Sequence, residues 1–352
     1  MKLFRWTILV CVIVLSVSAV EKPADVGLYV GCGSRGNGVI QWARLLTYAP
    51  QINLTLLDGA DITSGGLKKI DLLVMPGGSG FDQYDSMDQE AGAAAVRNYV
   101  REGGAYFGTC AGIAFALNEE KRARLIPFAR TPGPLRGGMT TTVTLTRRAA
   151  DLLGVQTGDW PIRYHNGPLP CATEDIAGCT AEVISTYNCE LMQKGEMPFP
   201  MHGKPAAVWA VCGRGKLLAF SCHPEMFPVS HPLIKGGLRA LTGHEVSFNY
   251  PHKNARPLRI AFYTGALGGK IPVETALMLD ARADIDLLPT TNSEITEGRL
   301  NHADILFLPE GDPSLAKRIR KNRTGFFVDD FAERGGQIIR SIKDIPVSLK
   351  LP

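Results

Sequence analysis

The sequence predicts an α/β fold: a mainly parallel sheet flanked by helices, followed by a smaller, degenerate α/β repeat. Three observations support this prediction. Short apolar runs alternate with segments of helical spacing, glycine-rich turns follow several of these runs, and the same plan returns near the carboxyl end. Parallel strands need long crossover connections, so alternation of strands and helices indicates a parallel sheet covered on both faces.

The first predicted unit opens with a strand, a glycine-rich turn and a helix. Val26 to Val30 is a short apolar run, the segment GCGSRG comes after it, and Val39 to Tyr48 has apolar residues at helical spacing. A second strand is predicted at Asn53 to Leu57. A third, buried strand is predicted at Asp71 to Met75, which ends at the turn Pro76-Gly77-Gly78.

The next helix and strand lead to a cysteine. Ala91 to Arg101 reads as a helix, and Gly103-Gly104 ends it. Ala105 to Gly108 reads as the following strand and runs directly into Thr109-Cys110-Ala111-Gly112. The predicted order is therefore strand, helix, strand and then a cysteine between glycines.

The carboxyl-terminal region repeats this plan. Arg259 to Tyr263 precedes a glycine-rich turn and a helix, and Asp304 to Gly311 resembles Asp71 to Gly78 at the corresponding separation. The second copy has Ile342 at the position of Cys110. The pattern predicts an internal duplication whose second copy is a half-domain without the nucleophile.

The chain divides into a leader and two predicted domains. Basic Lys2 and Arg5, an apolar run and a small-residue pattern ending at Ala19 are typical of a signal peptide, residues 1–19, cut after Ala19. The apolar run is about half of the roughly 20 residues that span a bilayer, so no stable membrane anchor is expected after cleavage. A catalytic domain is predicted at residues 24–247 and the half-repeat at 256–345. A secreted or periplasmic protein is expected.

Charge and cysteine content restrict the function further. The net charge of +4 is too small to indicate nucleic-acid binding. Seven cysteines follow the predicted leader, an odd number in a compartment that favours disulfides, and four of them lie between Cys171 and Cys212. That stretch is also rich in Pro and Gly, which predicts a disulfide-stapled, loop-rich insertion. Since no CxxC pair or zinc-like His/Cys spacing occurs, no metal is expected.

Cys110 lies in a predicted nucleophile elbow. Gly108 and Gly112 let the backbone turn sharply after a buried strand and leave the cysteine side chain exposed at the strand's carboxyl end. The helix expected to begin near Ala111 directs the positive end of its dipole toward the sulfur and favours the thiolate. The alternative is a buried structural cysteine in a glycine-rich turn.

A histidine and a carboxylate follow a second predicted strand. Lys216 to Phe220 reads as a strand, and a hairpin turn at Gly213 to Lys216 joins it to an apolar strand at Ala206 to Val211. His223 and Glu225 come directly after it. A histidine that accepts a thiol proton needs an anion at its other ring nitrogen, and Glu225 is placed to supply one.

These motifs resemble those of a known superfamily. Pro76-Gly77-Gly78, the elbow at Cys110 and His223-Pro224-Glu225 look like the signature of class I glutamine amidotransferases. Residues 103–112 and 164–168 are more similar to the family named after the amino-terminal domain of biotin-protein ligases. The resemblance covers roughly two thirds of the chain and implies a flavodoxin-like sheet.

The resemblance also implies roles for individual residues. Cys110 would be the nucleophile, His223 the base and Glu225 the group that orients the histidine. Backbone N–H groups of Gly78 and Ala111 would form the oxyanion hole.

Four further residues have alternative interpretations. Gly77, His165 and Asn166 are candidate substrate-binding residues, although Asn166 also begins an ordinary Asn-Gly-Pro turn. Cys222 is either a redox partner of Cys110 or a disulfide or core cysteine, and strand alternation favours the second role. Apart from the basic glycine turn near Arg214, nothing suggests biotin or ATP, so no cofactor is expected.

One departure from the superfamily concerns the substrate. Glutamine amidotransferases place glutamine two residues beyond the second elbow glycine, where this chain has Ala114, which argues against glutamine as the natural substrate. The sequence favours an exported cysteine-dependent hydrolase or amidotransferase that forms a thioester on Cys110 with a small-molecule or peptide amide. The alternatives are a non-catalytic ligand-binding or scaffold protein and a thiol-based redox protein. The oligomeric state stays open.

Overall fold

The computed structural model describes residues 22–131, 137–190, 200–265, 272–309 and 323–341. The predicted signal peptide lies outside these residues. In the described part of the chain, no helix is long and apolar enough to cross a membrane.

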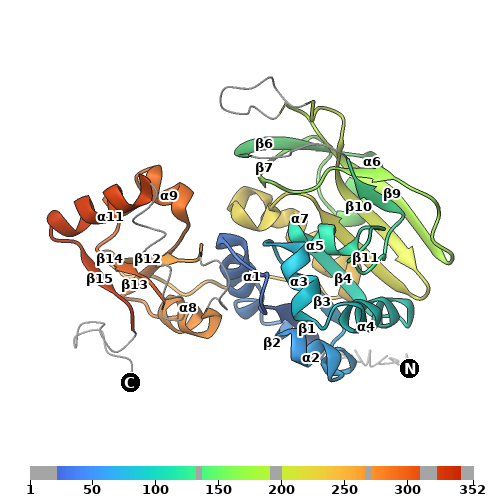
Figure 1. Cartoon of the computed structure of the whole chain (residues 1–352), viewed down its shortest axis with the longest axis horizontal. Helices are drawn as coiled ribbons and strands as arrows, with labels where there is room; N and C mark the ends of the chain where they lie inside the picture. Colours follow the sequence, from blue (N-terminus) through green and yellow to red (C-terminus); the bar gives the residue numbers. More distant parts are fainter. Residues whose placement is uncertain (1–21, 132–136, 191–199, 266–271, 310–322, 342–352) are drawn as a thin grey trace, which may run out of the picture.

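The larger unit is built on a nine-stranded sheet, with the order β2-β1-β3-β4-β11-β10-β9-β6-β7 among the described residues (Figure 1). The first five strands in this order pair in parallel, and the neighbours from β11 onward pair antiparallel. The parallel strands are β1 (Ala24–Tyr29), β2 (Ile52–Leu57), β3 (Leu72–Met75), β4 (Ala105–Thr109) and β11 (Gly215–Phe220). The antiparallel strands are β6 (Gly138–Leu145), β7 (Asp159–His165), β9 (Cys179–Tyr187) and β10 (Pro205–Cys212). A separate pair joins β5 (Phe128–Arg130) and β8 (Pro170–Ala172).

Helices cover both faces of this sheet. One hydrophobic core contains residues of α1, α6 and α7, and the other contains residues of α2, α4 and α5. The helices of the larger unit are α1 (Asn37–Thr47), α2 (Gly59–Thr63), α3 (Gly80–Ser86), α4 (Glu90–Arg101), α5 (Ala111–Ala116), α6 (Arg147–Leu153) and α7 (His231–Thr242), with 3₁₀ turns η1 (Gly66–Lys69), η2 (Pro224–Met226) and η3 (Pro228–Ser230). The predicted α/β class with a helix-flanked parallel sheet is confirmed.

The prediction of a loop-rich insertion between Cys171 and Cys212 is wrong for the residues described there. This stretch forms β9 and β10. Its Pro and Gly residues lie mainly at the ends of these strands and in the connections between them. The prediction of a staple is confirmed: a disulfide joins Cys179 and Cys212, which lie opposite each other in the ladder with their Cα atoms 4.0 Å apart. Cys222 is a fully buried core cysteine without a disulfide.

The smaller unit contains a second, wholly parallel sheet, with the order β13-β12-β14-β15. This order matches that of β2-β1-β3-β4 in the larger sheet. Its strands are β12 (Leu258–Tyr263), β13 (Ile285–Thr290), β14 (Ile305–Phe307) and β15 (Gln337–Ile339), and its described helices are α8 (Val273–Asp280), α9 (Asn292–Thr296), the 3₁₀ turn η4 (Arg299–His302) and α11 (Arg323–Glu333). Ile342, expected at the position of Cys110, lies outside the described residues.

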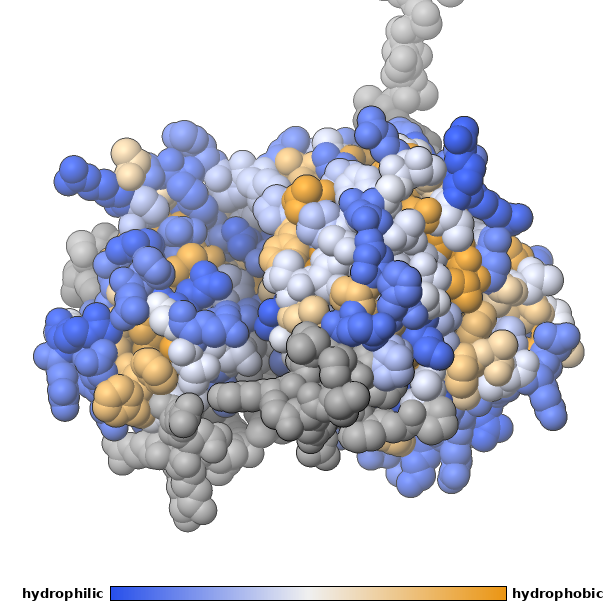
Figure 2. Space-filling view, turned by 90° about the horizontal axis from the view of Figure 1, so that it is seen from above, coloured by the Kyte–Doolittle hydropathy of each residue, from blue (hydrophilic) through white to orange (hydrophobic). Residues whose placement is uncertain are grey.

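Helix α1 joins the two units, which lie side by side in Figure 1. Asp280 at the end of α8 is fully buried and accepts hydrogen bonds from Arg44 Nε at 2.9 Å and Tyr48 Oη at 2.8 Å. Lys253 Nζ lies 3.6 Å from the other Asp280 carboxylate oxygen. On the surface seen from above in Figure 2, hydrophobic residues are interspersed among hydrophilic ones. The polar contacts along α1 therefore fix the position of the smaller unit.

Candidate active site

Cys110 occupies a sharp turn between β4 and α5. Its backbone has φ 53° and ψ −101°, a conformation that residues with side chains rarely adopt. A Cβ atom at Gly108 would lie 2.8 Å from the carbonyl carbon of Gly112, and one at Gly112 would lie 2.1 Å from the Met75 carbonyl oxygen. Both flanking glycines are therefore required by close backbone contacts, as in a nucleophile elbow.

The structure brings Cys110, His223 and Glu225 together at the carboxyl ends of neighbouring strands β4 and β11. His223 Nδ1 lies 2.7 Å from Glu225 Oε1, and the histidine ring and Cys110 Cβ both lie close to Gly77. Glu225 is fully buried, whereas Cys110 and His223 retain 7% and 9% exposure. The order of contacts is that of a nucleophile, a base and a carboxylate that orients the base.

The protonation of His223 depends on its neighbours. Burial lowers its pKa, but the negative charges on Cys110 and Glu225 and the hydrogen bonds to them outweigh burial and raise the pKa to about 10. His223 is therefore an imidazolium at neutral pH when the cysteine is a thiolate. The surroundings of His223 therefore favour its charged form.

Two glycines pack directly against this pair. A Cβ atom at Gly38, in the first turn of α1, would lie 2.6 Å from Glu225 Oε1 and 3.2 Å from His223 Nδ1. A Cβ atom at Gly77 would lie 2.6 Å from His223 Cε1 and 3.6 Å from Cys110 Cβ. Gly77, predicted to bind substrate, thus lies where it fixes the histidine ring.

A buried chain of hydrogen bonds supports the carboxylate. Trp42 Nε1 donates to Thr109 Oγ1 at 3.1 Å, and Thr109 Oγ1 donates to Glu225 Oε1 at 3.4 Å. Both donors are shielded from solvent. Helix α1 and strand β4 therefore hold Glu225 against His223.

Gly78 and Ala111 present backbone N–H groups near Cys110. Gly78 lines the same cleft as Cys110, and Ala111 is the first residue of α5. Among the described residues, neither N–H donates to a protein acceptor. Gly78 has φ 148°, and a Cβ atom there would lie 1.9 Å from the Gly33 carbonyl oxygen, so only glycine fits. The two free donors suit a developing oxyanion.

His165 and Asn166 lie at the end of β7, beside Cys110. Cys110 Sγ is 3.4 Å from the His165 carbonyl oxygen. Burial, followed by the charges of His223 and Arg163, lowers the pKa of His165, so its ring is neutral at pH 7. Asn166 has φ 53°, and its Oδ1 accepts from the Gly137 N–H at 2.6 Å, which is a turn-forming role alongside its place in the cleft.

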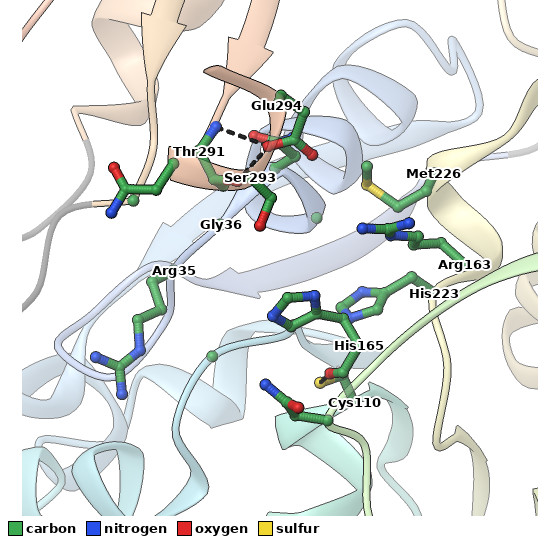
Figure 3. A pocket seen from close by; sticks show the side chains of 16 residues that line it. Arg35, Gly36, Cys110, Arg163, His165, His223, Met226, Thr291, Ser293 and Glu294 are labelled. Carbon is green, nitrogen blue, oxygen red and sulfur yellow. Dashed lines mark hydrogen bonds between the residues drawn. The ribbon is translucent and has the colours of Figure 1, made fainter. Parts of the chain in front are cut away.

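The cleft has a volume of about 450 Å³ and lies between the two units. In Figure 3, Cys110, His223 and His165 lie on one side, and Thr291, Ser293 and Glu294 lie on the other. The residues that line it are Arg35, Gly36, Asn37, Gly38, Gly78, Cys110, Arg163, His165, Asn166, His223, Met226, Gly265, Thr291, Asn292, Ser293 and Glu294. Within the described ranges, no cluster of three or more His, Cys, Asp or Glu side chains could hold a metal ion.

Sequence reasoning missed the wall that the smaller unit supplies. Thr291 and Glu294 form a capping box at the start of α9, in which the Glu294 carboxylate accepts from the Thr291 N–H at 2.9 Å. The Thr-x-x-Glu spacing signals a helix start in the sequence. Its position in the cleft depends on contacts with α1, such as that of Asn37 Nδ2 with Glu294 Oε1 at 2.9 Å. Arg35, Gly38, Arg163 and Met226 were also missed, because no motif marks them.

Comparisons with known proteins agree with parts of this description. Residues 62–121 match the family described as Biotin-protein ligase, N terminal. An uncharacterized protein of Chlamydia muridarum (strain MoPn / Nigg) is 35% identical over 78 residues, 22% of this chain. The match spans 30% of that relative's length.

Three solved structures share 12–13% sequence identity with this chain. The cytoplasmic protein STM3548 from Salmonella typhimurium covers 62% of this chain and 98% of its own, with a TM-score of 0.40. PurLQS from Thermotoga maritima covers 62% and 99%, with a TM-score of 0.44. A putative ThuA-like protein from Bacteroides uniformis covers 64% and 94%, with a TM-score of 0.44. The family match at residues 62–121 shows that this chain carries a stretch similar to the amino-terminal family of biotin-protein ligases.

Proposed function

We propose that the protein is an exported cysteine-dependent hydrolase of the amidotransferase type, which acts on an amide or related carbonyl through a thioester on Cys110. The observation that supports this most directly is the contact chain Cys110–His223–Glu225 in an elbow at the edge of a cleft. The resemblance to class I glutamine amidotransferases supports the same chemistry. The disulfide Cys179–Cys212 supports export, because disulfides persist in oxidising compartments.

The proposed reaction uses residues of the larger unit. The Cys110 thiolate attacks the carbonyl carbon, and the N–H groups of Gly78 and Ala111 stabilise the oxyanion. The His223 imidazolium gives its proton to the departing amine as the C–N bond breaks and the thioester forms. Water then attacks the thioester, His223 takes a proton from it, and the C–S bond breaks. The carboxylic acid leaves and the thiolate–imidazolium pair is restored.

The test is the pH dependence of Cys110 alkylation by iodoacetamide, measured by peptide mass spectrometry with the other cysteines as internal controls. If His223 activates Cys110, the cysteine should label faster at neutral pH than the other cysteines do, because the thiolate is the form that reacts. His223→Ala should slow labelling at neutral pH by about 100-fold, the usual contribution of a positioned base.

His302→Ala, an exposed histidine of the smaller unit, is the matched control and should leave labelling unchanged. Cys110→Ala should abolish turnover of amide substrates while the protein stays folded. A Cys110 that labels like a free thiol and ignores His223→Ala would contradict the proposal. That result would favour the alternative, a ligand-binding or scaffold protein on the same fold.

A further inference from the structure

Arg163 lies on β7 above the catalytic residues. Side chains alternate along a strand, and Tyr164 is fully buried in the core, so Arg163 and His165 both face the cleft. The Arg163 carbonyl oxygen accepts from the His223 N–H at 2.8 Å, which holds this part of β7 next to the catalytic histidine. Figure 3 shows Arg163 between His223 and Met226, at the side of the cleft near Glu294.

The Arg163 guanidinium has no partner in the described part of the chain. No hydrogen bond from it and no carboxylate within ion-pair distance are found, although the side chain is half-buried. The other arginine in the cleft differs, because Arg35 Nη2 lies 2.9 Å from Asp82 Oδ2. A guanidinium carries five donors and is almost always paired when it is partly withdrawn from water. Arg163 is therefore equipped for a group that binds from outside.

The carboxylates that line or flank the cleft are occupied by other donors. Glu225 is hydrogen-bonded to His223 Nδ1. Glu294 Oε1 accepts from Asn37 Nδ2, while Oε2 accepts from the N–H and hydroxyl of Thr291. His165 contributes no charge at neutral pH, because its pKa is lowered. Among the described residues that line the cleft, Arg163 is thus a cation without a carboxylate partner, and Glu294, whose donors are all neutral, is an anion without a cation partner.

We propose that Arg163 binds an anionic group of carboxylate type on the substrate whose carbonyl Cys110 attacks. This inference rests on the proposed function. The anionic group would lie against the Arg163 guanidinium, and the wall that the smaller unit forms from Thr291 to Glu294 would contact the uncharged part of the substrate, so both units recognise it. A neutral amide of the same size lacks the partner that the guanidinium needs.

The electrostatics of the free site support this assignment. The positive charge of Arg163 lies close enough to help lower the pKa of neighbouring His165, after burial and the charge of His223. Because Glu225 balances the charge of His223, Arg163 is the cation available to an anionic group, whereas Glu294 on the opposite wall repels such a group. A planar guanidinium also matches a carboxylate in a two-bond fork, which fixes the substrate's orientation.

The experiment compares two alkylating agents of nearly equal size on the full-length mature protein. Iodoacetate carries a carboxylate, and iodoacetamide is neutral. The rate of each with Cys110 is measured at pH 7 and low salt by peptide mass spectrometry. Arg163→Gln should lower the iodoacetate rate by about tenfold, the effect of losing one charged hydrogen bond, and leave the iodoacetamide rate unchanged. Arg163→Lys should keep part of the preference, because it retains the charge without the fork.

Arg147→Gln is the matched control, since it removes an exposed arginine of α6 that pairs with Asp151 and does not line the cleft, and the ratio of the two rates should not change. An unchanged ratio in Arg163→Gln, with rapid iodoacetamide labelling, would overturn the assignment and leave the proposed function standing. Slow labelling of wild-type Cys110 by both agents would instead contradict the proposed function and remove the basis of the assignment.

Discussion

Two four-stranded segments of this protein share one construction but differ in the residues that come after their strands. In β2-β1-β3-β4, Asp71 Oδ2 accepts from the Asp25 N–H at 2.9 Å, and in β13-β12-β14-β15, Asp304 Oδ2 accepts from the Arg259 N–H at 2.8 Å. In the larger unit, β3 and β4 lead into the residues around Cys110. In the described residues, the turn at Cys110 follows β4 of the larger unit, and the position that corresponds to it in the smaller unit lies outside them.

Both segments also contain a capping box at the start of a helix, and the box of the smaller unit lines the cleft. Asp58 and Asp61 form a capping box at the start of α2, and Thr291 and Glu294 form one at the start of α9. The first is largely exposed to solvent. The second contacts Asn37 and lines the cleft. A local motif therefore specifies a helix start, whereas its neighbours decide whether it takes part in a site.

The largest expected effect comes from breaking the contact between the larger and the smaller unit at Asp280. Asp280→Ala removes a fully buried carboxylate and leaves Arg44 and Lys253 without their anion. We expect a loss of about 3–5 kcal/mol in the free energy of unfolding, the usual cost of removing one partner of a buried pair. Urea unfolding measures it. Asp284→Ala, which breaks a partly exposed pair with Arg282, should cost less than the loss of the fully buried Asp280. Equal losses of unfolding free energy in the two variants would show that Asp280 stabilises the protein no more than Asp284 does.

A smaller effect is expected from crowding the catalytic pair without removing any of its members. Gly38→Ala places a Cβ atom 2.6 Å from Glu225 Oε1, so the carboxylate must move away from His223. The rate of Cys110 alkylation at pH 7 should fall by about tenfold, as when one charged hydrogen bond is lost. Circular dichroism should show unchanged helix content, because alanine is the better helix former. Unchanged alkylation would show that Gly38 does not confine the pair.

The smallest effect tests whether the two segments are equivalent. Asp71→Ala and Asp304→Ala each remove a carboxylate that accepts from the backbone N–H at the start of a neighbouring strand. Because both carboxylates are partly exposed, each substitution should lower the free energy of unfolding by about 0.5–1 kcal/mol. The exposed Arg259, 3.7 Å from Asp304, should add little. A clear difference between the two losses would show that the shared contact differs in strength between the two segments.

The sequence predicted local structure well and spatial neighbours poorly. The elbow could be predicted because Gly108, Cys110 and Gly112 are adjacent in the chain and their backbone needs are specific. His223 and Glu225 could be placed near Cys110 because the carboxyl ends of parallel strands meet at one edge of a sheet. These inferences rest on short-range patterns and one rule of sheet geometry.

The remaining features depend on packing that no local pattern encodes. In the sequence, Gly38 resembles an ordinary residue of a turn before a helix, because its contact with Glu225 arises only when α1 folds over η2. Arg163 sits in a strand of mixed polar and apolar residues, and its lack of a partner among the described residues is visible only in three dimensions. Strand β9 was hidden by the Pro and Gly residues around it, whereas β10 and its hairpin to β11 were predicted from the apolar run at Ala206 to Val211.

Helix α1 touches both halves of the cleft. Near its start, Gly38 rests against Glu225 while Asn37 holds Glu294, and further along Arg44 holds Asp280. One helix therefore supports the carboxylate beside His223 and the wall contributed by the smaller unit, so the two sides of the cleft share a single support.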